Sequence, residues 1–146
     1  MIKVGVSKWC VLAFVITSPA LAGTLETVSL TLWGEARNQD YAGKSGVASV
    51  IWNRANANPA RFKAVCLAPH QFSCWRKREF TQPMPDLHKP QDRLAWRDCV
   101  TLASLMCNGT FLPDFGARHY HEARIKPYWS VNAPMLASVG DHVFYK

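Results

Sequence analysis

The sequence lacks several features that would each indicate a class of protein. It has no compact run of lysine and arginine, and the nearest approach, Arg76-Lys77-Arg78, is typical of a solvated loop. It has no Cys-x-x-Cys spacing, which makes a structural zinc site less favoured. It has no internal repeat and no low-complexity segment. What remains is a chain of 146 residues, the size of one domain.

The sequence also lacks an apolar run long enough to form a stable transmembrane helix. The run from Trp9 to Ile16 is short, follows two lysines, and precedes the small residues of Ala20-Leu21-Ala22. This order is typical of a secretory signal, so residues 1–22 are predicted to be a signal peptide, with a retained signal anchor as the alternative. Export to the periplasm or cell wall follows, and membrane contact is expected only transiently, through this segment.

Acidic residues are fewer than basic ones, and the formal net charge is +7. Removing residues 1–22 removes Lys3 and Lys8 and no acid, which leaves about +5 by the same count. A basic exported protein suits an anionic partner such as cell wall or a membrane surface. Export argues against nucleic acid as the partner.

Cysteines are few, and cleavage of the signal would remove Cys10. An even number in an exported chain predicts two disulfides, with four reduced, buried thiols as the alternative. A helix running from Pro90 to Cys107 would hold Cys99 and Cys107 some 12 Å apart, too far for a bond. The favoured pairings therefore join the 66–74 loop to this helix. The four cysteines are Cys66, Cys74, Cys99 and Cys107.

Apolar residues at helical spacing predict three helices. The first covers residues 25–36, the second 42–56, and the third begins at Pro90 and continues to about Cys107. Residues 57–89 have no clear period and predict a long, structured loop. Alternation at 117–121 and 141–145 predicts two short strands that could pair, with an aromatic-rich loop at 126–129 between them. The predicted fold class is α+β, mostly helical, with a small C-terminal β-sheet.

Glu35 stands where the first helical pattern ends, between Trp33 and Arg37. The free carbonyls of a helix C-terminus and desolvation by Trp33 would both favour the neutral acid, which a general acid requires. Arg37 would favour the carboxylate. The plain alternative is a solvated glutamate at a helix end. A second candidate feature is Gln71-Phe72-Ser73-Cys74-Trp75, where hydrogen-bonding side chains alternate with rings as in sugar sites, or where the rings simply pack in the core.

Taken together, several segments resemble the cell wall hydrolase family of spore-cortex-lytic enzymes (SleB/CwlJ type). The resemblance covers nearly all of residues 23–146, in the right order. The matching segments are Trp33–Arg37, Tyr41–Gly43, Val47–Arg54, Val65-Cys66, Gln71–Ser73, His119-Tyr120, Pro127–Trp129 and Gly140–Tyr145.

The resemblance implies that residues 23–146 are a cell wall hydrolase catalytic domain with a lysozyme-like fold related to lytic transglycosylases. It implies cleavage of peptidoglycan glycan strands with Glu35 as the catalytic residue. It implies no metal and no cofactor, and a monomer is expected. The substrate-binding residues that it implies are Asn53, Gln71, Ser73, Tyr120 and Trp129.

This chain departs from the family in two respects. It lacks the N-terminal peptidoglycan-binding repeat common in spore enzymes, and it has Arg76-Lys77-Arg78-Glu79 where members vary. A short, exported chain of this kind fits phage lysis or cell wall remodelling better than a spore role.

In the expected chemistry, Glu35 protonates the glycosidic oxygen between N-acetylmuramic acid and N-acetylglucosamine. A two-carboxylate glycosidase needs a second acid, and the nearest in sequence is Asp40. Lytic transglycosylases need none, because the C6 hydroxyl of the substrate attacks the anomeric carbon and gives a 1,6-anhydro sugar. One glutamate without a clear partner favours this route over muramidase-type hydrolysis.

Two rival functions remain open on the sequence. A zinc-dependent amidase or peptidase could use His119 and His121 from one strand and His142 from the other, with Glu122 as the base. A non-catalytic wall-binding module would instead use aromatic sugar platforms, namely Trp75, Tyr128 and Trp129.

Overall fold

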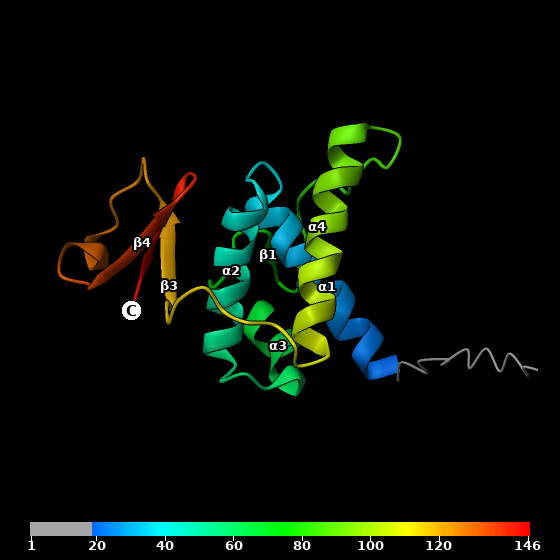
Figure 1. Cartoon of the computed structure of the whole chain (residues 1–146), viewed down its shortest axis with the longest axis horizontal. Helices are drawn as coiled ribbons and strands as arrows, with labels where there is room; N and C mark the ends of the chain where they lie inside the picture. Colours follow the sequence, from blue (N-terminus) through cyan, green and yellow to red (C-terminus); the bar gives the residue numbers. More distant parts are fainter. Residues whose placement is uncertain (1–18) are drawn as a thin grey trace, which may run out of the picture.

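The computed structural model describes residues 19–146, where four helices pack together and a small sheet lies beside them (Figure 1). The predicted signal segment therefore lies mostly outside the described residues. The helices are α1 (Pro19–Ala36), α2 (Tyr41–Arg54), α3 (Pro59–Cys66) and α4 (Pro90–Cys107). The strands are β1 (Trp75–Arg76), β2 (Glu79–Phe80), β3 (His119–Glu122), β4 (Met135–Val139) and β5 (His142–Tyr145), and a 3-10 turn, η1, covers Tyr128–Val131.

Helix starts follow local sequence. The side chain of Asp40 accepts a hydrogen bond from the backbone N–H of Gly43 and so caps α2. Asn58 caps α3 in the same way, and Pro59 occupies the first turn, where its missing N–H costs nothing. Pro90 begins α4 likewise. None of the helices in residues 19–146 is both long and apolar enough to cross a membrane.

The main core lies among the helices. α1 is central to it, because it packs against α2, α3 and α4. Its buried residue Leu32 belongs to one apolar cluster that also contains side chains of the other three helices. Phe62 and Met106, both fully buried, belong to this cluster. The apolar stripes on the helices thus meet in one core, as amphipathic helices require.

The C-terminal sheet has the strand order β3-β5-β4, and both pairings are antiparallel. Tyr120 of β3 pairs with Phe144 of β5. Phe144 packs with Val50 and Ala117 in a second, smaller apolar cluster. Gly46 of α2 makes this contact possible, because a Cβ there would lie 2.6 Å from the Phe144 ring. The sheet is therefore held against α2, as Figure 1 shows.

The predicted α+β fold, mostly helical with a small C-terminal sheet, is confirmed. Five elements were not predicted: α3, β1, β2, η1 and β4. α3 falls within the segment expected to be a loop, since only Phe62 and Cys66 of its eight residues are buried and show helical spacing. β4 was missed because most of its residues are exposed and do not alternate in hydrophobicity.

The two predicted disulfides are not present among the described residues, where all four cysteines are free thiols. The Cys66 thiol forms a hydrogen bond with Thr31, and the Cys74 thiol lies against Glu35. Burial raises the pKa of Cys66 to about 12 and that of Cys99 also to about 12. The thiolate that disulfide formation needs is therefore scarce at these positions.

Candidate active site

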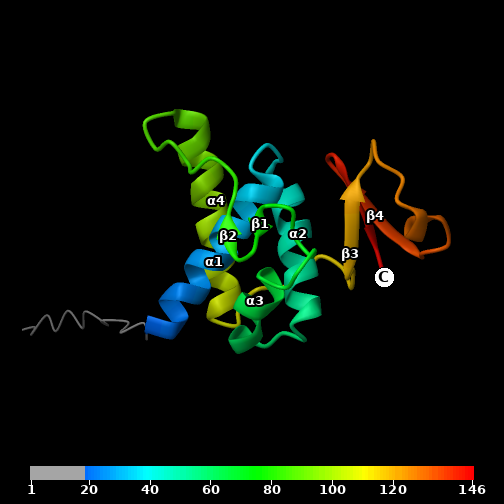
Figure 2. The same ribbon diagram turned by 180° about the vertical axis from the view of Figure 1, so that it is seen from behind.

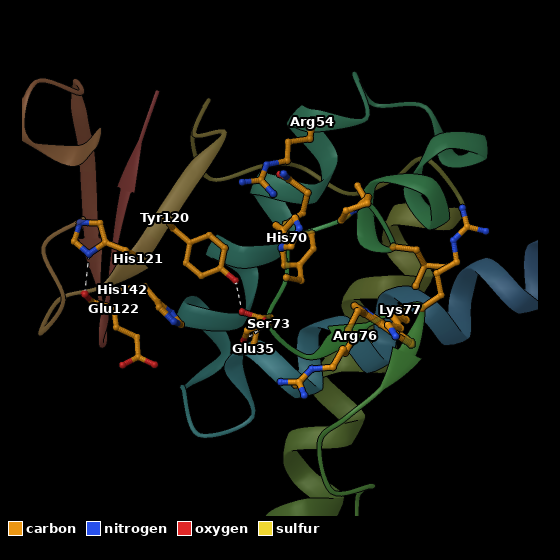
Figure 3. Close-up of a pocket in the computed structure, with 18 of the residues that line it drawn as sticks. Glu35, Arg54, His70, Ser73, Arg76, Lys77, Tyr120, His121, Glu122 and His142 are labelled. Atoms are coloured by element: carbon orange, nitrogen blue, oxygen red, sulfur yellow. Dashed lines mark hydrogen bonds between the residues drawn. The ribbon is translucent and has the colours of Figure 1, made fainter. Parts of the chain in front are cut away.

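Glu35 lies in the last turn of α1, and its carboxylate accepts hydrogen bonds from three other groups (Figure 3). Tyr120 Oη donates to Oε2 at 2.7 Å. Ser73 Oγ and the backbone N–H of Cys74 donate to Oε1 at 3.2 and 3.0 Å. The donors come from β3 and from the loop after α3. Three segments far apart in sequence thus fix the position of one carboxylate.

Gly34 allows the loop to approach α1 this closely. A Cβ at Gly34 would lie 2.4 Å from Cβ of Cys74, a distance that real atoms do not adopt. The glycine beside Glu35 is therefore required for the Cys74 N–H to reach the carboxylate.

The sequence neighbours of Glu35 do not surround it as expected. Trp33 is buried, donates its indole N–H to the Pro83 carbonyl and packs edge-on against Trp96. The guanidinium of Arg37 lies over the Trp33 ring, with 5.7 Å between its carbon and the ring centroid. Residues two apart on a helix point to opposite sides, whereas residues four apart share a face. Trp33 and Arg37 therefore contact each other rather than Glu35.

Tyr120 is held as a hydrogen-bond donor. Burial, followed by the charge of Glu35, raises the pKa of its hydroxyl well above the usual range. Its ring stacks on Phe144 and meets the edge of His142. The phenol is therefore protonated at neutral pH, and its O–H donates to Glu35.

Glu35 lines a cavity of about 1110 Å³, which is large enough for several sugar rings. One wall is the segment from Leu67 to Arg78, and the opposite wall is formed by β3 and His142 (Figure 3). Glu35 and Gly34 lie between the two walls. A smaller adjoining cavity of about 540 Å³ also includes Glu35, together with Glu122 and His142. The arrangement is a groove with one carboxylate at its base.

The sequence-predicted binding residues divide into two groups. Gln71, Ser73 and Tyr120 line the cavity with Glu35. Asn53 does not line it, because its amide nitrogen donates to the carbonyls of Phe115 and Ala117, 2.9 Å away in each case. This contact holds the segment that leads into β3.

Trp129 is also absent from the cavity lining. It packs against His119, His121 and Tyr145 on the other side of the sheet. The sequence placed it in an aromatic loop, but side-chain direction depends on how η1 folds back on β3.

Three further polar residues of the lining were not among the predicted substrate-binding residues: Arg54, His70 and His142. Arg54 donates from Nε to the Arg118 carbonyl and lies over the Phe72 ring. Burial lowers the pKa of Arg54 from its usual value and also lowers that of His142. His142 is therefore neutral at neutral pH. Arg54 and His142 lie in two segments of the family resemblance, Val47–Arg54 and Gly140–Tyr145, whereas His70 lies in none.

Two other acidic residues, Asp40 and Glu122, differ in whether they line the cavities. Asp40, considered as a second catalytic carboxylate, caps α2 and does not line either cavity. Glu122 lines both cavities together with Glu35, and it forms an ion pair with Arg124. If a second carboxylate takes part in the chemistry, Glu122 is the better placed of the two.

The histidines of the rival zinc site lie on two faces of the sheet. His142 pairs across the strands with Glu122, whereas His121 pairs with Val143. Directly paired residues share a face and successive residues alternate, so His142 lies opposite to His119 and His121. Within residues 19–146, no group of three or more histidine, cysteine, aspartate or glutamate side chains is arranged to hold a metal ion.

β1 and β2 pair as a short hairpin (Figure 2). This hairpin places three cationic residues in the lining of the cavity. Its two-residue turn consists of Lys77 and Arg78, which have positive φ angles of 49° and 67°. This conformation costs a residue other than glycine ~1–2 kcal/mol. Arg76, Lys77 and Arg78 are all exposed and all line the cavity.

Comparison with known proteins agrees with this fold. The catalytic domain of the germination-specific lytic transglycosylase SleB from Bacillus anthracis is 22% identical, with a TM-score of 0.60 over 89% of this chain and 97% of that chain. The catalytic domain of Bacillus cereus SleB is 20% identical, with a TM-score of 0.58 over 86% and 91%. No functionally curated protein matches the chain. The fold is thus that of SleB catalytic domains.

The family model described as Cell Wall Hydrolase matches residues 38–145, well over half of the chain. The protein belongs to this cell wall hydrolase family and is an enzyme that acts on the peptidoglycan of the cell wall. Glu35 precedes the matched region by three residues, so its role is argued from its surroundings.

Proposed function

We propose that the protein is a lytic transglycosylase that cleaves the bond between N-acetylmuramic acid and N-acetylglucosamine, with Glu35 as the general acid and base. The observation that carries this proposal is the carboxylate of Glu35, fixed by three donors at the base of an open groove. A side chain held in this way loses little freedom when the substrate binds, which lowers the barrier to reaction.

The reaction uses the one carboxylate twice. Glu35 gives its proton to the O4 atom of N-acetylglucosamine as the bond from that oxygen to C1 of N-acetylmuramic acid breaks. The C6 hydroxyl of N-acetylmuramic acid then attacks C1, and Glu35 takes the hydroxyl proton. The products are a free O4 hydroxyl and a 1,6-anhydro end, and no water is consumed.

The other groove residues are proposed to position the sugar. Gln71 is exposed in the loop that forms one wall, where its amide suits sugar hydroxyls. Ser73 and Tyr120 reach the reacting groups only through Glu35. Asn53 and Trp129 support the walls from outside the cavity.

Hydrolysis is the second candidate, and Glu122 is the observation that favours it. Glu122 and Glu35 line the same two cavities. A base on the opposite wall could activate a water molecule, as in two-carboxylate glycosidases. The product would then carry a reducing end instead of an anhydro ring.

The proposed cellular location follows from the proposed substrate. Peptidoglycan lies outside the cytoplasmic membrane, so we propose that residues 1–22 direct export and that the mature protein acts as a monomer in the periplasm or cell wall. Phage lysis or wall remodelling is the proposed role. Neither role affects the chemistry of the groove.

Mass spectrometry of digested peptidoglycan tests the proposal. Residues 23–146 should release fragments that end in 1,6-anhydro-N-acetylmuramic acid, and Glu35→Gln should release at least ~10³-fold less, because it cannot supply the proton. Glu122→Gln should retain the anhydro product. Reducing ends that disappear with Glu122→Gln would instead establish hydrolysis.

Asp40→Asn is the matched carboxylate control. It keeps an N-cap and should leave the product unchanged. Intact glycan strands with released peptides, undiminished by Glu35→Gln, would contradict the central role of Glu35.

A further inference from the structure

The β1–β2 hairpin carries a cluster of charge that the proposed chemistry does not use. Arg76, Lys77 and Arg78 follow Ser73 and Cys74, the two residues that donate to Glu35. Figure 3 shows Arg76 and Lys77 on the same side of the cavity as Ser73. A ligand that occupies the groove near Glu35 would therefore lie within reach of these long side chains.

The cations occupy backbone positions that suit them poorly. A two-residue hairpin turn with two positive φ angles normally contains asparagine and glycine. Here the two positions hold Lys77 and Arg78. The turn would form more readily with other residues, so the backbone does not account for the charges. Residues kept in a strained conformation at a cavity are candidates for contact with a ligand.

The charge of the hairpin is not neutralised within the protein. Among residues 19–146, none of the ion pairs includes Arg76, Lys77 or Arg78. Of the two carboxylates in the cavity, Glu35 is engaged by its three donors and Glu122 is paired with Arg124. Arg54 adds a further cation to the lining. The groove therefore has four cationic side chains against two carboxylates, an excess of positive charge.

We propose that the hairpin, residues 76–78, is a subsite for carboxylates carried on muramic acid, and that it makes the enzyme prefer anionic strands over neutral ones. This inference rests on the proposed cleavage of glycan strands in the same groove. Muramic acid offers two sources of carboxylate. Intact peptide stems carry free carboxylates, and a strand stripped of its stems exposes the lactyl carboxylate.

The double variant Lys77→Asn with Arg78→Gly tests the subsite without harming the fold. It removes two charges and installs the residues that this turn prefers. We expect the melting temperature to rise by roughly 2–8 °C. A loss of activity in a more stable protein cannot be ascribed to unfolding.

Three substrates separate the sources of the carboxylate. They are strands with intact stems, the same strands with their carboxylates converted to amides, and strands stripped by an amidase. The double variant should lower kcat/KM by roughly 3- to 20-fold on at least one anionic substrate, as expected for two exposed charge pairs, and should leave the amidated strands unchanged. Loss on intact strands identifies stem carboxylates, and loss on stripped strands identifies the lactyl group.

The matched control is Arg61→Gln with Lys63→Gln, which removes two exposed charges from α3, outside the cavity lining. It should change kcat/KM less than twofold on all three substrates. The preference of the wild type for anionic strands should also fall as salt increases. Equal rates for the double variant and the wild type on both anionic substrates, or equal losses on all three substrates, would overturn the proposal.

A binding measurement keeps this test separate from the proposed function. Glu35→Gln, alone and combined with the double variant, is sedimented with each of the three insoluble substrates. Weaker binding of the combined variant to an anionic substrate supports the subsite even if the wild type cleaves no glycan. Failure of the proposed function would instead appear as absence of glycan products from the wild type.

Discussion

The helical part of the molecule and the C-terminal sheet differ in how they are stabilised. The helices share a large apolar core that includes Leu32, Phe62 and Met106. The sheet has only a small cluster around Phe144, and several large apolar residues of the C-terminal region, such as Val131 of η1, are exposed. Yet the active site needs both regions, because α1 supplies Glu35 and β3 supplies Tyr120. Most of the stability thus lies in the helical region. The site instead lies at the joint, the contact between the helices and the C-terminal sheet.

The largest expected effect is on the helical core. Phe62→Ala should reduce the free energy of unfolding by ~3–5 kcal/mol, because the ring is fully buried and packs on Trp52. Val131→Ala, at a residue that is 74% exposed, should change it by less than ~0.5 kcal/mol. Denaturant titration measures both. Equal destabilisation would contradict the contrast between the two regions.

The next effect concerns the contact across the joint. Tyr120→Phe removes the donor to Glu35 and keeps the ring, so the turnover rate should fall ~10- to 100-fold, the value of a hydrogen bond to a charged group. Tyr128→Phe, at a residue that is 96% exposed, should have no effect. Turnover on peptidoglycan is measured together with the melting temperature. A normal rate for Tyr120→Phe would show that the other two donors suffice.

A smaller effect is expected where α2 meets the sheet. Gly46→Ala places a Cβ against the Phe144 ring, and that overpacking should outweigh the gain in helix propensity, for a net loss of about 1 kcal/mol. Displacement of β5 should also lower the turnover rate, because β3 and Tyr120 are paired with it. Gly116→Ala, with no atom within 4 Å of the added Cβ, is the control for denaturant titration. A harmless Gly46→Ala would mean that the joint is loosely packed.

The smallest effect is a dependence on pH. Burial lowers the pKa of His142 in the folded protein, although Glu122, Glu35 and Asp141 partly oppose this. Below the unfolded-state pKa of about 6.5, the unfolded chain binds a proton that folded His142 does not, so stability falls as pH decreases from 7 to 5. His142→Gln should flatten this slope by less than one proton, about 1.4 kcal/mol per pH unit at most.

Melting temperatures between pH 5 and 7.5 measure the slope. His88→Gln, at an exposed residue outside both cavities, is the control. A slope that is unchanged by His142→Gln would assign the acid sensitivity to other groups.

Local sequence determined much of the fold. Helical spacing from Leu25 to Ala36 and the proline at residue 90 located two helices, although α1 begins earlier, at Pro19. Alternation located β3 and β5, which pair as expected. The sequence did not predict α3 and β4, because few of their residues are buried and their hydrophobic periodicity is weak. Ordered motifs singled out Glu35, Gln71, Ser73 and Tyr120, and the structure places these four residues in the lining of one cavity.

Only the tertiary structure decided what surrounds those residues. Sequence adjacency placed Trp33 and Arg37 beside Glu35, but a helix turns residues two apart to opposite sides. Asn53 was assigned to the groove, yet its amide holds the segment before β3. The true neighbours of Glu35 come from residues 38 to 85 positions away. A sequence states which groups are available, whereas packing and strand register determine which of them meet.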